Sequence, residues 1–479
     1  MSTISDKRLS SDPESLTRRS AVLIVLSLVL LSEVASFEYN MVSPALPNIA
    51  TSFGTKQPGL VFTVLLICGA MTLPIMGKLG DVMGKKKVLL LGVGVMAVGT
   101  FISAIAPVYS IFLVGRGFQA FGVVGLVLTY GLIRDLLPKK WVPVSIGCLG
   151  AGVGLSSIAG PTIGGFLTQN YGYRSVFIFL TIYVVLSATF VAIAVPETPV
   201  RAPHKIDYFG ALLLGLGAAS LCYATIDTPL RGAAVVSGIL LFVIFIYVQR
   251  RVVEPLIPLK LVRQRKVWMT LLIAGLMGFI FNSNVAIISQ MAQSVPVPGV
   301  DSGLGMSPVT FSMTYALPLG ILGSISGFGA GVVSKKFGPK YSMIFSAVCW
   351  FSGSALVMFG LVISPTMLLV VAFIFGLGNG SYHASSSNLI IEAVPATTQG
   401  VGASLKTTSE QIFGAFGTAI TGSMVAASII SRPGSTEGTS YSMTGFQTSY
   451  GLYAAVALLA VIIAISLKHG NKPASGGAS

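Results

Sequence analysis

Charged side chains are scarce in this sequence, since they make up 9% of its 479 residues, against about a quarter in ordinary soluble domains. With 53% hydrophobic residues and a mean hydropathy of +0.85, this scarcity excludes a soluble globular protein. The composition therefore predicts an all-α membrane protein embedded in a lipid bilayer. The few charges are unbalanced, with 30 basic and 15 acidic residues, and the basic excess has to be explained.

Cysteine and histidine are rare as well. Each cysteine lies in an apolar run, which excludes the paired spacing of a zinc site and the loop positions of a disulfide framework. The three scattered histidines and the short loops argue against an enzyme or a receptor. Because the chain also lacks a Gly-x4-Gly-Lys-Ser/Thr loop, ATP is not the expected energy source. We expect no cofactor and no metal, and an ion gradient as the driving force, with protons as the coupling ion.

Long apolar runs dominate the rest of the chain. A helix needs about 20 mainly apolar residues to cross the hydrocarbon core of a bilayer. This rule predicts 14 transmembrane helices, at residues 20–42, 58–77, 87–107, 110–132, 143–168, 174–195, 206–226, 231–249, 267–292, 308–331, 341–360, 365–391, 399–429 and 446–467.

A repeated loop divides these spans into two halves. The stretch GKLGDVMGKKKVLLLG begins at Gly77, and GVVSKKFGPKYSMIFS begins at Gly331, 254 residues later. We predict two six-helix pseudo-repeat bundles, residues 20–200 and 267–467, with an inserted helix pair and its loops at 201–266. Such repeats are typical of secondary transporters, which bind substrate between the halves near the middle of the bilayer.

The basic residues predict the orientation. If the tails at residues 1–19 and 468–479 are cytoplasmic, cytoplasmic segments hold 24 of the 30 Lys and Arg, the opposite side holds four, and two lie inside spans. Cytoplasmic loops carry an excess of Lys and Arg, so both termini are expected inside. This topology explains the basic excess without nucleic acid. We expect a monomer in the plasma (inner) membrane.

The loop that begins at Gly77 has recognisable chemistry. Gly77 and Gly84 let two helix ends approach closely, and Asp81 can pair with a cation or a helix N-terminus. Lys85 and Lys86 can contact the anionic inner leaflet. The loop resembles the loop 2/3 signature of the major facilitator superfamily, and almost the whole chain resembles its 14-span drug:proton antiporters. The resemblance implies a cytoplasmic latch for the outward-open state; a purely topogenic basic loop is the alternative.

A basic and a polar side chain lie within the fourth predicted span. The stretch LVGRGFQAFGVVG places Arg116 a few residues into the span and Gln119 one turn later. It is similar to a motif of the superfamily whose arginine is implicated in proton transfer. An arginine at this depth needs a partner or a water-filled cavity. Arg116 therefore either keeps a carboxylate of the first span ionised or snorkels to the outer interface.

The fifth predicted span is rich in small residues. Its stretch GAGVGLSSIAGPTIGGFL resembles a motif associated with antiporters, which implies export. Small residues four apart permit close helix contact and proline introduces a kink, so we expect a pliable seam between helices. The residues concerned are Gly150, Gly154, Gly160, Pro161, Gly164 and Gly165.

Two carboxylic acids occur in the first span. Glu38 stands nine residues before Pro47, which matches the span 1 acid of the 14-span family, where Asp is usual. Five residues of an ideal helix separate Glu33 and Glu38 by about 140°, so both cannot easily face one small cavity. We expect Glu38 to exchange a proton for a cationic substrate, with Glu33 as a second candidate. A structural hydrogen bond or salt bridge is the alternative for each acid.

Polar residues of the second half complete the candidate site. Lys406 and Glu410 lie one turn apart in the thirteenth span, where they either neutralise each other or give Glu410 a role in proton or cation binding. Polar groups scattered among aromatic residues suit amphipathic ligands. The residues expected to line the substrate cavity are Gln119, Asn282, Asn284, Gln290, Asn379 and His383.

These features and the resemblance predict a transporter for multidrug efflux and antibiotic resistance. It would export lipophilic, cationic or amphipathic small molecules in exchange for protons, by alternating access. An amphipathic lipid transporter or a proton-coupled metabolite symporter of the same fold is the alternative.

Overall fold

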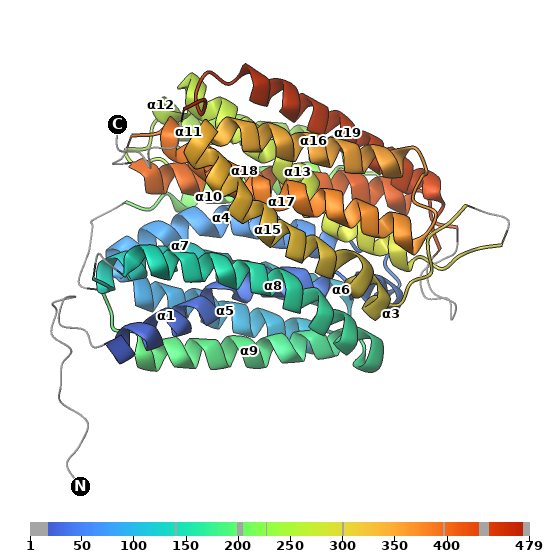
Figure 1. The fold of residues 1–479 in the computed structure, drawn as a ribbon, viewed down its shortest axis with the longest axis horizontal. Helices are drawn as coiled ribbons and strands as arrows, with labels where there is room; N and C mark the ends of the chain where they lie inside the picture. The colour runs from blue at the N-terminus through green and yellow to red at the C-terminus, as the bar shows by residue number, and fades with distance from the viewer. Residues whose placement is uncertain are drawn as a thin grey trace, which may run out of the picture.

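Helices make up almost all of the described chain (Figure 1). The computed structural model describes residues 18–138, 141–198, 205–226, 228–298, 301–395, 398–430 and 440–472. Over these ranges, isolated bridges are the only β-structure, so the predicted all-α class is confirmed. Most of the two predicted tails, residues 1–17 and 473–479, lies outside the described ranges.

The helices before residue 200 form the first half of the molecule. They are α1 (Arg18–Ser32), α2 (Val34–Val42), α3 (Leu46–Phe53), α4 (Leu60–Met83), α5 (Lys85–Ile105), α6 (Tyr109–Gln119), α7 (Val124–Leu136), α8 (Val142–Tyr171) and α9 (Tyr173–Ala194). The first span is interrupted at Glu33 and again just before α3. Pro44 lies at the second break, where it cannot donate a backbone hydrogen bond.

The remaining helices form a middle segment and the second half. The middle segment contains α10 (Tyr208–Tyr223), α11 (Arg231–Gln249) and the short α12 (Leu259–Val262). The second half contains α13 (Arg265–Gln293), α14 (Pro308–Phe311), α15 (Leu317–Phe337), α16 (Pro339–Met358), α17 (Pro365–Ala393), α18 (Gln399–Ala426) and α19 (Met443–Ser466).

Twelve helical segments of the described ranges are long and apolar enough to cross a membrane. This finding confirms a multi-pass membrane protein, but it does not support the predicted count of 14. Helix α10 has 16 residues and a length of about 24 Å, which is shorter than a hydrocarbon core of about 30 Å. Helix α18 has 28 residues but contains Lys406 and Glu410 among many small and hydroxyl side chains.

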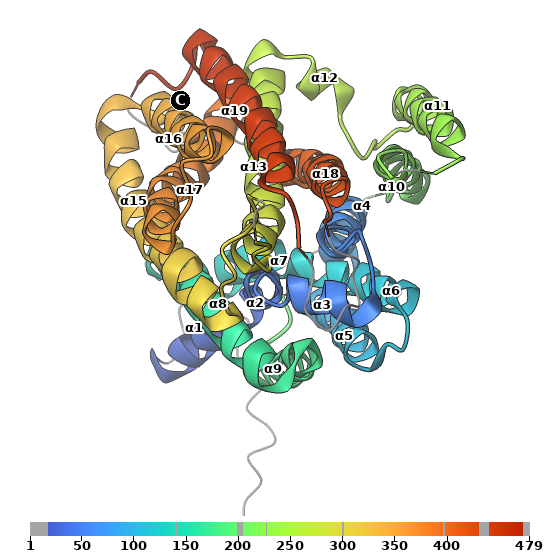
Figure 2. The same ribbon diagram turned by 90° about the vertical axis from the view of Figure 1, so that its right-hand side faces the viewer.

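The helices gather into two groups, α1 to α9 and α13 to α19 (Figure 2). Each group has its own buried apolar core, which includes Phe112 and Phe177 in the first half and Trp350 and Phe446 in the second. Helix α10 packs against α4, α11 and α18 at one side of the molecule. Smaller apolar contacts cross between the groups, because Ala286 of α13 joins the core of the first half and Leu66 of α4 packs with Ala415 of α18.

The repeated loop has the same backbone shape in both halves. Gly84 precedes α5 with a φ of 116°, and Gly338 precedes α16 with a φ of 104°, angles that favour glycine. Lys86 Nζ lies 2.8 Å from a carbonyl oxygen near the end of α9, and Lys340 Nζ lies 2.8 Å from one at the end of α19. The offset of 254 residues therefore marks equivalent positions. Gly77 does not make the close helix contact that its place in the loop predicts, because a side chain there would lie in open space.

The described hydrogen bonds between the two halves all lie toward the end of the molecule away from the termini. Helix α1 begins and α19 ends at the other end (Figure 1). The Tyr39 hydroxyl donates to the carbonyl oxygen of Asn282 at 2.6 Å, and the Ser289 hydroxyl donates to that of Ser43 at 2.6 Å. These contacts close the molecule at the end away from the termini.

The segment after α19 folds back against the second half. The backbone N–H of Lys340 donates to the carbonyl oxygen of Gly470 at 3.1 Å. His469 is buried, and its Nε2 lies 3.0 Å from the Thr270 hydroxyl in α13. Burial, together with the nearby charges of Lys266 and Lys340, lowers the pKa of the His469 imidazole to about 4.

We expect this contact to weaken as the pH falls from about 6.5 to about 4. The imidazole binds a proton more readily when the segment is free than when it is docked, so acid favours release. Hydrogen exchange at the Lys340 amide, compared with its intrinsic rate, should accelerate over this window. His469→Gln should remove the pH dependence, and an equal acceleration in that variant would contradict the assignment.

Candidate functional site

A buried ion pair joins the first and fourth spans of the first half. Glu38 lies on α2 and Arg116 lies on α6, and Arg116 Nη1 donates to Glu38 Oε1. The side chain of the glutamate is 1% exposed and that of the arginine 0% exposed. An unpaired charge at this depth would be costly, so each residue neutralises the other.

Arg116 is held on several sides and does not reach the surface. Its Nε donates to the carbonyl oxygen of Val61 at 3.1 Å, and its Nη1 also donates to Gln119 Oε1. The rings of Phe62 and Phe177 lie 5.9 Å from the guanidinium carbon, within the range of a cation–π contact. Nη2 has no hydrogen-bond partner among the described residues. Arg116 therefore keeps a donor group that another partner could use.

Glu33 lies at the break between α1 and α2 and faces α8. Its buried carboxylate accepts hydrogen bonds from Ser156 at 3.0 Å and from Ser32 at 3.4 Å. Over the described part of the chain, no lysine or arginine forms an ion pair with it. The two acids of the first span thus have separate partners on different helices.

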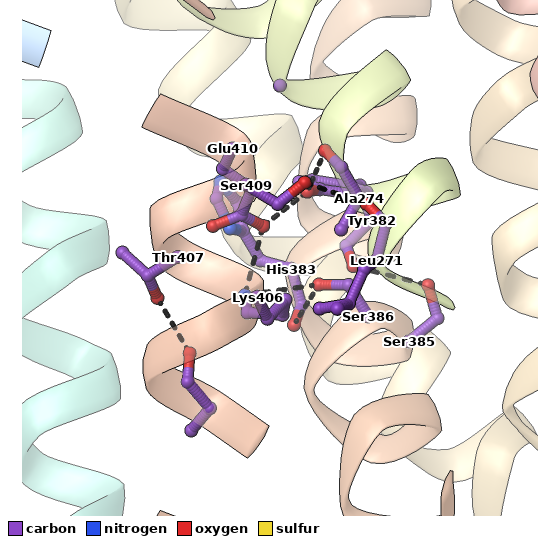
Figure 3. Close-up of polar contacts among 12 residues, drawn as sticks. Leu271, Ala274, Tyr382, His383, Ser385, Ser386, Lys406, Thr407, Ser409 and Glu410 are labelled. Atoms are coloured by element: carbon purple, nitrogen blue, oxygen red, sulfur yellow. Dashed lines mark hydrogen bonds and ion pairs between the residues drawn. The ribbon is translucent and has the colours of Figure 1, made fainter. Parts of the chain in front are cut away.

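A second charged cluster lies where α13, α17 and α18 meet (Figure 3). Lys406 Nζ lies 3.0 Å from Glu410 Oε1, one turn along α18. The same oxygen accepts a hydrogen bond from Tyr382 of α17, whose hydroxyl oxygen also lies 3.2 Å from the carbonyl oxygen of Ala274. The side chains of Lys406 and Glu410 are 10% and 14% exposed. This pair is therefore more accessible than the pair in the first half.

Aromatic rings connect the second cluster to the boundary between the halves. His383 is exposed and stands edge-on to Phe281, with ring centroids 5.2 Å apart. Phe281 stacks in turn on Tyr39 of the first half, with centroids 6.5 Å apart. Asn379 lies one turn before His383, and its buried Oδ1 has no hydrogen-bond partner within the described ranges. This boundary therefore combines aromatic surface with polar groups.

The other polar residues predicted for the cavity are engaged inside the second half or at its edge. Asn284 donates to the Tyr315 hydroxyl at 2.7 Å and accepts from that of Tyr450 at 2.6 Å. Gln290 donates to a carbonyl oxygen one turn earlier in α13, at 3.2 Å. Asn282 lies at the boundary, where its backbone accepts from a tyrosine of the first half. In this conformation Asn284 and Gln290 therefore find their hydrogen-bond partners within the second half.

The loop between α4 and α5 makes its ion pairs within the first half. Lys85 Nζ lies 2.7 Å from a carboxylate oxygen of Asp135 in α7 and 3.5 Å from one of Asp81. The carboxylate of Glu197, after α9, accepts from the backbone N–H of Lys86 at 3.1 Å. The side chain of Asp81 is 41% exposed, so it remains accessible to another partner.

Two of the glycines in α8 lie directly against α2. A Cβ atom at Gly164 would collide with the backbone of Met41, and one at Gly160 would meet the Asn40 side chain. Only a residue without a side chain allows this close approach of the two helices. Gly150, on the same helix, has open space around it.

Other small residues of α8 face the second half. A Cβ atom at Gly154 would meet the Ser324 hydroxyl of α15, 2.8 Å away. Near the closed end, the Pro161 carbonyl oxygen accepts a hydrogen bond from Ser312 at 2.7 Å, and Gly165 lies against the same serine. Helix α8 therefore contacts α2 on one side and the second half on another.

Several partners of the charged residues could not be predicted from the sequence. Tyr39 bonds to the other half, Ser156 donates to Glu33, and Tyr382 donates to Glu410. Tyrosine and serine are common in membrane helices, so neither residue type stands out in the sequence. Their only sequence signal is position, because Tyr39 directly follows Glu38 and Tyr382 directly precedes His383.

The ion pair of the first half is sensitive to protonation of its acid. Protonation of Glu38 would remove its charge and weaken its attraction to Arg116. The guanidinium would keep its hydrogen bonds to Val61 and Gln119. Binding of one proton therefore turns the charge–charge interaction between α2 and α6 into an interaction between a neutral acid and a cation.

The chain is similar to characterised transporters in both sequence and fold. It is 27% identical over 380 residues to the tetracenomycin C resistance and export protein of Streptomyces glaucescens, which covers 76% of this chain and 68% of that protein. It is 26% identical over 445 residues to the riboflavin transporter RibZ of Clostridioides difficile, which covers 90% of this chain and 94% of that protein.

The fold is similar to a crystal structure of a bacterial homologue of the human lysosomal transporter Spinster in an inward-facing and unoccupied conformation. The TM-score is 0.68 and the identity 15%, with 94% of this chain and 97% of that chain covered. The sequence itself matches the Major Facilitator Superfamily over residues 28–418 and again over 283–479. Because these matches cover most of the sequence, the chain belongs to the Major Facilitator Superfamily.

Proposed function

We propose that this chain is a proton-coupled secondary active transporter that exports lipophilic, cationic or amphipathic compounds by alternating access. The buried pair of Glu38 and Arg116 is the observation that carries the proposal. Intramembrane charges are rare and usually functional. A proton and a cationic substrate can compete for the same carboxylate, which is the minimum requirement for exchange.

The contacts between the halves support alternating access. If both termini are cytoplasmic, as the basic residues predict, the described conformation is closed outside and faces inward. In the opposite state the cytoplasmic end has to close. Asp81 is half-exposed here and would be available to contact the second half in that state. A membrane potential supplies about 2.3 kcal/mol per charge per 100 mV, enough for one or two protons to drive a substantial substrate gradient.

We further propose that α10 and α18 also cross the membrane of the cell, which would give 14 spans with α10 and α11 as an inserted pair. Helix α10 runs beside α4, α11 and α18 (Figure 2). Lys78 at the end of α4 donates to the carbonyl oxygens of Lys205 and Glu254, at 3.4 and 3.2 Å. These bonds tie the segments that flank the pair to the first half. The protein would act as a monomer without a cofactor.

A metabolite transporter or an amphipathic lipid transporter of the same fold is the second candidate. One relative is named as a riboflavin transporter, and another as a resistance and export protein. The small residues of α8 favour export, because their stretch resembles the antiporter motif. Gly154 and Gly165 lie against the second half, where small side chains would permit the halves to rock.

Proteoliposomes that contain the purified protein and a pH-sensitive dye test the proposal. Addition of tetraphenylphosphonium, a lipophilic cation, should drive protons across the membrane in the opposite direction. Liposomes without protein provide the baseline. Cation flux without proton movement would refute the coupling, and the absence of both would refute cation transport.

A further inference from the structure

The two buried ion pairs differ in their access to a ligand. The pair of Glu38 and Arg116 is 1% and 0% exposed, so a ligand cannot reach it without a conformational change. The pair of Lys406 and Glu410 is 10% and 14% exposed in the same conformation. A ligand that enters this state therefore meets the pair of the second half first.

Lys406 can turn to a new partner while Glu410 keeps one of its hydrogen bonds. Its ammonium has three donors and lies 3.0 Å from Glu410 Oε1 and 3.5 Å from the Ser386 hydroxyl. Glu410 also accepts a hydrogen bond from Tyr382, so it keeps a donor when the lysine turns away. A carboxylate from a ligand could thus replace Glu410 as the partner of Lys406, at lower cost than the removal of either charge.

The surroundings of Lys406 fit an aromatic ring. Asn379, His383 and Ser386 are spaced by four and three residues on α17, so they lie on one face of that helix. His383 is exposed and lies close to Lys406 and Glu410 (Figure 3). Its ring stands edge-on to Phe281, which gives a planar ligand two aromatic contacts. The unpartnered Oδ1 of Asn379 could accept a hydrogen bond from a polar group at the far edge of the ligand.

We infer that Lys406 binds the carboxylate of amphipathic aromatic acids, with the aromatic part of the ligand against His383 and Phe281. This inference rests on the proposed function, because it adds a second substrate class to the same transporter. It places the acidic group of the substrate in the second half, away from the proton-binding glutamate of the first half. One carrier could then accept cationic and acidic aromatic compounds at different positions.

Equilibrium dialysis with the purified full-length protein in nanodiscs tests the inference. The probes are 2-naphthoate and its neutral isostere 2-naphthamide, which differ in charge but hardly in shape. The wild-type protein should bind the acid about tenfold more tightly than the amide. Lys406→Gln should bring the two affinities within about twofold, and Lys406→Arg should restore the preference, because it restores the positive charge.

Lys336→Gln is the matched control, because Lys336 is an exposed lysine next to Phe337 at the end of α15. It should leave the preference for the acid unchanged. Equal binding of acid and amide by the wild-type protein, or an acid preference that persists in Lys406→Gln, would overturn the inference. Binding at equilibrium needs no proton gradient, so a failure of proton coupling in proteoliposomes would refute the proposed function without changing this result.

Discussion

Glu38→Gln should reduce proton movement on addition of a lipophilic cation by about 100-fold or more, the loss that follows when an essential proton-transfer group is removed. The amide has nearly the shape of the acid but cannot bind and release a proton. It also leaves Arg116 without a counter-ion in a position that is 0% exposed. Breaking a buried pair in this way costs about 3 to 5 kcal/mol, so the variant should also have a lower thermal stability than the wild type. The measurement is the initial rate of dye response in proteoliposomes at matched protein content.

Two variants make this result specific. Glu38→Asp keeps the carboxylate on a shorter side chain and should retain coupled transport at a reduced rate. Asp301→Asn removes a carboxylate from an exposed position between α13 and α14 and should have no effect. If Glu38→Gln is folded and transports protons as fast as the Asp301→Asn control, Glu38 is not the coupling residue.

The presence of a buried acid and a buried arginine in the first half could be predicted from the sequence, because it depends only on residue type. An acid or an arginine inside an apolar run needs a partner or a water-filled cavity, and mutual pairing is one way to meet that need. The sequence could not choose between pairing and snorkelling, because that choice depends on where α6 sits relative to α2. The carbonyl of Val61 and the rings of Phe62 and Phe177 surround the guanidinium only after the helices have packed.

The number of spans shows a different limit. Counting apolar runs treats each run alike, but α10 is too short by the length rule and α18 has too many polar residues by the composition rule. In α18, the polar residues include Lys406 and Glu410, which satisfy each other within one turn. A helix whose charges are paired internally can be buried in a bundle even when its mean hydropathy is low. Apolar runs in the sequence thus give 14 candidates, whereas 12 of the described helical segments are long and apolar enough to cross a membrane.

The repeat was the most informative pattern in the sequence. Gly84 and Gly338 both adopt positive φ values, and Lys86 and Lys340 both bind the end of the last helix of their half. Backbone conformation and a capping lysine are local properties, so a constant offset could identify them. Contacts between the halves, such as Tyr39 with Asn282, join residues 243 positions apart and leave no such trace.

Gly164→Ala should cause the largest loss of stability among single-methyl changes in α8. The new Cβ atom would collide with the backbone of Met41, and a backbone cannot move aside as a flexible side chain can. The two helices would have to separate, at a cost of about 1 to 3 kcal/mol or more, as overpacking of a tight interface requires. Because α2 also holds Glu38, the separation should reduce coupled transport as well as the melting temperature.

Gly150→Ala provides the matched comparison, because it adds the same methyl group to the same helix at a position with open space. Alanine is a better helix former than glycine by about 0.5 to 1 kcal/mol, so this variant should be neutral or slightly more stable. Thermal unfolding followed by size-exclusion chromatography compares the two directly. Equal melting temperatures for the two variants would contradict this prediction. They would show that α8 and α2 can separate at no cost in stability, so that their contact does not hold Glu38 in position against Arg116.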